Sequence, residues 1–179
     1  MKLISLWEPW ATLMALGAKK IETRSWATSY RGWLAIQASK GGLNMADLRS
    51  QCFERQFYEA LQEFTPFAQQ ISNDVRHKKW IKEVFPHGQI VAVVKLVDCC
   101  PTVDMIPNPA FPCVFKKYPA LDTSEERTFG NYERGRWGWV TGNLFRLPEP
   151  IPFSAKQGIY DVPEEVVQQL RRQYKGATL

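Results

Sequence analysis

The segment that most constrains the fold is residues 89–97 (QIVAVVKLV). Its aliphatic residues follow one another almost without a break, whereas a strand with one solvated face would alternate apolar and polar residues. We therefore predict a strand that is buried on both faces and lies in the interior of a sheet. The chain of 179 residues is long enough to bury such a strand, and we expect one domain over residues 1–179.

Shorter patterns predict further strands and helices on either side of that run. The expected strands cover residues 2–7, 19–24, 33–38, 136–142, about 144–147 and about 158–160. A short helix should begin at Pro9 and end at Gly17, because proline is tolerated at a first helical position and glycine suits the position after a helix. A C-terminal helix is expected over about 163–174. These elements predict an α+β fold, built on a small mixed β-barrel of about six strands.

Two segments depart from this pattern of strands. Between about 41 and 86, apolar residues recur at helical spacing, and Asn44 and Thr65 can cap helix starts, so we predict two inserted amphipathic helices. Residues 101–135 contain five prolines and no period, which predicts a long loop. We expect this loop to lie over the mouth of a pocket, because structureless segments of that length are often functional.

Composition excludes several classes of function. Four cysteines without a CxxC spacing and two separated histidines are too few for a zinc site or a histidine-dependent triad. No apolar stretch has the length of a membrane span, and the first apolar run is too short for a signal peptide. We therefore expect a cytoplasmic monomer with reduced thiols, no metal, no cofactor and no membrane association. The formal net charge of +5 suits an anionic partner.

A dense group of motifs occupies the first forty residues. It reads E-P-W-A from Glu8, G-A-K-K-I-E-T-R from Gly17 to Arg24, and Y-R-G ending at Gly32. The pattern P-W/Y-A, then G-x-K-x-x-E-x-R, then R-G resembles the ASCH domain family, and the resemblance extends over about residues 2–162. It implies a PUA-like β-barrel with a cleft that is lined by the G-x-K-x-x-E-x-R segment and binds RNA or nucleotides.

The motifs and the aromatic residues supply the candidate binding site. The candidates are Pro9, Lys19, Glu22, Arg24, Trp26, Arg31, Gly32, Trp137 and Trp139. On a strand Glu22 and Arg24 share a face and can pair, which would orient the guanidinium toward a phosphate or a base edge. The alternative is a solvated strand with a salt bridge of little worth.

The remaining candidates have simpler roles. Trp26 and one of Trp137 and Trp139 are candidates for stacking on a base, and packing in the core is the other interpretation of each. Trp10 and Trp33 are expected in the core. The arginine and glycine at positions 31 and 32 either form a turn or let the backbone approach a phosphate.

An enzymatic interpretation uses the same residues. Some small bacterial members of the family are amidohydrolases that deacylate cytidine with a Lys, a Thr three residues later and a distant Glu. Lys19 matches that lysine, but Glu22 occupies the threonine position, and a carboxylate does not replace a hydroxyl nucleophile. The family also usually has Gln where this chain has Glu8, and a carboxylate accepts hydrogen bonds without donating them.

We therefore predict an RNA-binding or modified-nucleotide-binding protein. One alternative is a hydrolase in the same cleft, acting on acylated cytidine or on RNA, with Lys19 and Glu22 as its catalytic residues. The second alternative is a protein-interaction adaptor that uses the inserted helices.

Overall fold

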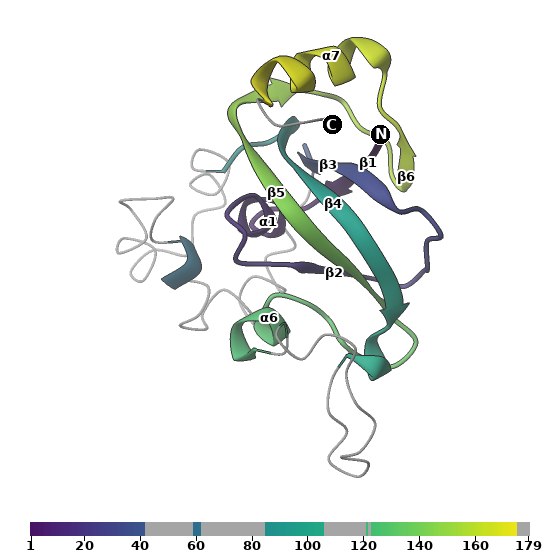
Figure 1. Ribbon diagram of the computed structural model, residues 1–179. Helices are drawn as coiled ribbons and strands as arrows, with labels where there is room; N and C mark the ends of the chain where they lie inside the picture. The colour runs from purple at the N-terminus through teal and green to yellow at the C-terminus, as the bar shows by residue number, and fades with distance from the viewer. Residues whose placement is uncertain (42–58, 62–84, 106–120, 122, 175–179) are drawn as a thin grey trace.

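The computed structural model describes residues 1–41, 59–61, 85–105, 121 and 123–174 (Figure 1). Its centre is a six-stranded mixed sheet, curled into a half-barrel, with the strand order β2-β5-β4-β3-β1-β6. The strands are β1 (Lys2–Leu6), β2 (Ile21–Arg24), β3 (Gly32–Ala38), β4 (Gln89–Pro101), β5 (Trp137–Pro152) and β6 (Ile159–Asp161). Strands β1 and β3 are parallel, and the other neighbouring pairs are antiparallel. This arrangement confirms the predicted α+β class and is consistent with a PUA-like barrel.

Short helices flank the sheet. They are α1 (Trp10–Ala15), the 3-10 helix η1 (Thr102–Asp104), α6 (Ser124–Thr128) and α7 (Glu164–Gln173), with α7 and α6 at opposite ends of the molecule in Figure 1. Helix α1 begins one residue after Pro9, which occupies the N-cap position without a side-chain cap. It ends before Gly17, whose φ of 77° is the left-handed conformation that glycine adopts without strain. Across the described residues, none of the helices combines the length and apolar character that spanning a membrane would require.

The sheet buries both of its faces. On one face α1 packs against Ile4, Leu6, Leu34, Ile36, Val94, Leu96 and Trp139. On the other face α7 packs against Leu3, Ala35, Ile90, Val93, Leu147 and Ile151. Because successive side chains of a strand point to opposite faces, a strand in the middle of such a sheet must be apolar at nearly every position. Strand β4 lies between β5 and β3, which confirms the predicted interior position of residues 89–97.

Residues 137–152 form one strand, where the sequence predicted two. Asn143 has a φ of 48°, and the pairing of β5 with β4 shifts register at three places, so the ladder absorbs the irregularity without ending. Strand β2 pairs only with residues 137–140 of β5, so the second half of β5 has one edge without a strand partner among the described residues. Proline has no N–H to donate to a neighbouring strand, and this open edge explains why Pro148 and Pro150 are tolerated there.

The two segments that interrupt the strands are described only in part. Of the predicted helical insertion at 41–86, only residues 41, 59–61 and 85–86 are described, and the rest lies outside the described residues. The described part of 101–135 corrects the expectation of a continuous loop, because it contains η1 and α6. Helix α6 begins after Thr123, whose hydroxyl oxygen accepts a hydrogen bond from the Glu126 N–H at 3.1 Å. A helix of five residues is too short to show a period in the sequence.

Candidate functional site

An open cleft of about 340 Å³ lies where β2, the junction of β1 with α1, and the segment after α6 come together. Its lining residues are Ser5, Leu6, Trp7, Trp10, Lys19, Glu22, Thr23, Arg24, Phe129, Gly130, Asn131 and Arg136. The cleft therefore brings the three charged residues of the G-x-K-x-x-E-x-R segment together with residues from a distant part of the chain. Its volume is at the small end of the range for ligand sites.

Lys19 lies at the base of the cleft, and its side chain is 1% exposed. The Nζ atom donates hydrogen bonds to the carbonyl oxygens of Ile21 at 2.6 Å and Phe129 at 2.8 Å, and it lies 3.5 Å from Oε2 of Glu22. Two of the three ammonium hydrogens therefore go to backbone carbonyl oxygens, and the Glu22 contact is an ion pair. Lys19 joins β2 to the segment after α6 and faces a counter-charge within the protein.

Glu22 and Arg24 share a face of β2, as the alternation of the strand predicts. Arg24 Nε lies 2.9 Å from Glu22 Oε1, and Arg24 Nη2 donates to the carbonyl oxygen of Ser5 at 2.8 Å. The Nε–H bond does not point along the first contact, which makes it an ion pair and not an aligned hydrogen bond. The two side chains are 13% and 27% exposed, so β2 is not a solvated surface strand.

The start of β2 is hydrogen-bonded to a carboxylate that was not among the candidates from the sequence. Glu126 of α6 is 3% exposed, and its two oxygens accept hydrogen bonds from the backbone N–H groups of Lys20 at 2.7 Å and Ile21 at 2.9 Å. The Tyr132 hydroxyl donates to Oε1 at 3.3 Å. Burial raises the pKa of Glu126, and the Lys19 charge and the two N–H groups oppose that rise. Glu126 therefore caps backbone donors of an edge strand and stabilises the floor of the cleft.

Glu8 stands between cleft-lining residues in the sequence, but its own side chain is buried away from the cleft lining at 1% exposure. Oε2 accepts a hydrogen bond from the Thr12 N–H at 3.1 Å, and Oε1 has no hydrogen-bond partner within the described part of the chain. Burial raises the pKa of Glu8 to about 8, against the opposing effect of Thr12. The raised pKa favours the protonated form of the carboxyl group, which can donate a hydrogen bond as a glutamine side chain can.

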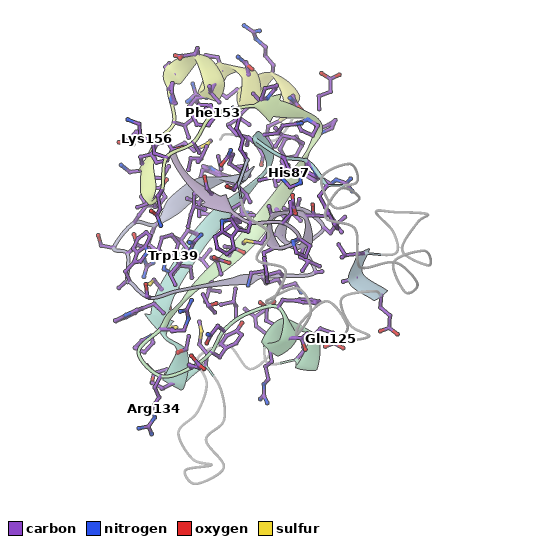
Figure 2. The ribbon with its side chains drawn as sticks, turned by 180° about the vertical axis from the view of Figure 1, so that it is seen from behind. His87, Glu125, Arg134, Trp139, Phe153 and Lys156 are labelled. Carbon is purple, nitrogen blue, oxygen red and sulfur yellow. The ribbon has the colours of Figure 1, made fainter. Side chains whose placement is uncertain are left out.

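The candidate tryptophans of β5 lie in the core and not in the cleft. Trp139 is fully buried near the middle of the molecule (Figure 2), and Trp26 packs edge-on against it with ring centroids 4.6 Å apart. Trp137 is partly buried against the same cluster, so the two tryptophans of β5 share a face. Gly138 separates these two tryptophans, and a Cβ atom there would clash with the Met105 side chain, so Met105 occupies the space beside this glycine.

Pro9, Arg31 and Gly32 also lie outside the cleft lining. Pro9 is buried and precedes α1. Arg31 pairs with Asp98 at 2.9 Å and donates to the backbone carbonyl oxygens of Thr28 and Tyr30. Gly32 has a φ of 132°, which a residue with a side chain rarely adopts. In this structure the R-G part of the motif forms the entry to β3.

Several cleft residues were not among the candidates from the sequence. Trp7 is 48% exposed, which is unusual for a tryptophan, and Trp10 is half-buried in the cleft although the sequence placed it in the core. The sequence signal that could have identified these two tryptophans as cleft residues is their position on either side of the motif proline. Asn131 and Arg136 carry no local signal, because only the packing of the segment after α6 onto β2 brings them to the cleft.

No cluster of three or more His, Cys, Asp or Glu side chains suited to a metal ion occurs among the described residues. A comparison with protein-family models matches residues 4–134 to the family described as the ASCH domain. No curated protein matches the chain.

Proposed function

Because this chain belongs to the ASCH domain family, we propose that its cleft binds RNA or a modified nucleotide. The observation that carries the proposal is the composition of the cleft, which joins three cations (Lys19, Arg24 and Arg136) and one carboxylate (Glu22) to two tryptophans (Trp7 and Trp10). Cationic groups attract phosphate oxygens, and aromatic faces stack on unpaired bases. A volume of about 340 Å³ suits one nucleotide unit.

Trp7 is the best candidate for the stacking residue. It is the most exposed of the large hydrophobic residues in the described structure, at 48%, and it lines the cleft. A large aromatic side chain that remains exposed in a concave site offers apolar area to a ligand at little conformational cost. Trp26 and Trp139 use their rings to pack against each other, so their faces contribute to the core.

The contacts of Lys19 support binding over hydrolysis. An amidohydrolase needs this lysine to take up a proton, and here Nζ donates to two backbone carbonyl oxygens and forms an ion pair with Glu22. Glu22, at the position of the family's threonine, is engaged by Lys19 and Arg24. Both residues therefore act in the proposal as a preorganised charged floor beneath the ligand.

Isothermal titration calorimetry with nucleosides, nucleotides and short RNAs tests the proposal, with chromatography of each mixture to detect products. We expect saturable binding without product. The variant Trp7→Ala should bind about 5- to 150-fold more weakly, because stacking on a base contributes about 1–3 kcal/mol.

The matched control is Leu144→Ala, which removes another exposed apolar side chain (40% exposed) that does not line the cleft. It should bind as the wild type does. Absence of saturable binding, or equal affinities of wild type and Trp7→Ala, would contradict the proposal, and release of a product would identify a hydrolase.

A further inference from the structure

We infer that Arg136 binds the phosphate group of the ligand, so that the cleft selects phosphorylated nucleotides over nucleosides. The inference rests on the proposed function and extends it by naming the residue and the chemical group that it recognises. Arg136 differs from the other two cations of the cleft in that it lacks a counter-charge among the described residues.

Lys19 and Arg24 already have a counter-charge within the protein. The Glu22 carboxylate lies 3.5 Å from Lys19 Nζ and 2.9 Å from Arg24 Nε, so it offsets much of their charge. Arg136, in contrast, forms no ion pair with any carboxylate of the described residues. It is half-buried, and a partly desolvated cation without a counter-ion favours the binding of an anion.

The anchoring of Arg136 leaves one edge of its guanidinium available. Nε donates a hydrogen bond to the carbonyl oxygen of Asn131 at 3.2 Å, and Nη2 donates to the carbonyl oxygen of Thr23 at 3.1 Å. A guanidinium carries five N–H hydrogens in a plane, so both hydrogens of Nη1 and the second hydrogen of Nη2 remain. This edge has the geometry that donates to two oxygens of one phosphate.

The turn that anchors Arg136 is itself held in place. The Asn131 N–H donates to the Thr23 hydroxyl oxygen at 3.0 Å, and the Asn131 side-chain oxygen accepts from the Glu133 N–H at 2.9 Å. Arg24 is the register partner of Trp137, so Arg136 adjoins the end of the β2–β5 pairing, where Arg24 also lines the cleft. The phosphate site is therefore built on fixed backbone and lies beside the charged floor.

The test compares each of the four common nucleosides with its 5′-monophosphate by calorimetry. We expect the monophosphate to bind about tenfold or more tightly to the wild type, as a charge-assisted pair of hydrogen bonds provides. Arg136→Gln should abolish this preference and leave the affinity for the nucleoside within about threefold. Dinucleoside monophosphates form a further arm that distinguishes a terminal phosphate from the phosphodiester of an RNA chain.

The matched control is Arg134→Gln. Arg134 is exposed, and in Figure 2 it extends away from the lower end of the protein. The Arg134→Gln variant therefore loses the same charge two residues away from Arg136. It should keep the preference for the monophosphate. A second measurement uses only the wild type: inorganic phosphate at constant ionic strength should weaken binding of the monophosphate but not of the nucleoside.

Equal binding of nucleosides and monophosphates to the wild type would overturn the inference and leave the proposed function standing. Retention of the preference in Arg136→Gln would also overturn it. If Arg136→Gln does not fold, the phosphate competition decides, and equal effects on both ligands would overturn the inference. If no nucleoside, nucleotide, dinucleotide or short RNA binds, the proposed function fails and the inference fails with it.

Discussion

Glu126 and Glu8 are both buried almost completely, at 3% and 1% exposure, but their surroundings differ. The carboxyl group of Glu126 accepts hydrogen bonds from two backbone N–H groups and one hydroxyl group, and it feels the charge of Lys19. The carboxyl group of Glu8 accepts one backbone hydrogen bond, and its second oxygen has no partner among the described residues. The contacts of Glu126 suit a charged carboxylate, whereas the surroundings of Glu8 suit a protonated one.

The comparison shows that donors and charges around a buried acid, and not burial alone, decide its role. Glu126 stabilises the start of β2 next to Lys19, and thereby supports the cleft. Glu8 anchors the first turn of α1, and its stability contribution should depend on pH. Three substitutions, each with a control, test this difference.

Glu126→Ala should produce the largest loss of stability. It leaves two backbone N–H groups of the edge strand without their acceptor and removes a negative charge near Lys19. We expect the free energy of unfolding to fall by about 3–5 kcal/mol, measured by urea denaturation followed by circular dichroism.

Glu125→Ala is the matched control, because Glu125 lies on the same helix with an exposed side chain (Figure 2). Its substitution should lower the free energy of unfolding by about 1 kcal/mol or less, because interactions of an exposed charge are weak. Equal losses in the two variants would show that Glu126 does not hold β2.

Glu8 should make the stability of the wild type fall as the pH rises. Its pKa is raised from 4.5 to about 8 by folding, so the folded state binds more protons than the unfolded state between these values. The stabilisation that protonated Glu8 provides is complete below the pKa of Glu8 in the unfolded protein. It is lost as the pH rises through the pKa of Glu8 in the folded protein. Glu8→Gln removes this dependence, and it should be more stable than the wild type at pH 9 by about 2–4 kcal/mol.

Urea denaturation at several pH values between 5 and 9 measures this effect. The exposed Glu149 provides the control, since Glu149→Gln removes one carboxyl group without removing a buried one. If the curve of Glu8→Gln against pH runs parallel to that of the wild type, Glu8 is not the titrating group.

Tyr132→Phe should have the smallest effect. It removes a single hydroxyl donor, at 3.3 Å from Glu126 Oε1, and leaves the two backbone donors in place. We expect a loss of about 0.5–1.5 kcal/mol in the free energy of unfolding. In a double-mutant cycle the loss should disappear in the Glu126→Ala background, and an undiminished loss there would show that Tyr132 stabilises the fold by other contacts.

Local patterns were sufficient to predict most of the elements. The unbroken apolar run at 89–97 predicted an interior strand, and Gly17 marked the end of α1, because burial and turn conformation constrain residues that are close in the sequence. The spacing of Glu22 and Arg24 predicted their shared face for the same reason. The long β5 was not predicted as one strand, because β-bulges depend on the partner strand as much as on the sequence of β5.

The local pattern predicted a strand over 19–24 after a short helix, and it identified the family; the observed strand begins at Ile21, and Lys19 precedes it. The surroundings of that strand depend on the tertiary structure. Glu126 accepts a hydrogen bond from the first residue of β2, 105 residues earlier in the chain. Arg136 is held at the cleft by the carbonyl oxygens of Thr23 and Asn131. Such contacts depend on how sheet register and loop packing bring distant residues together, and they leave no period or spacing in the sequence.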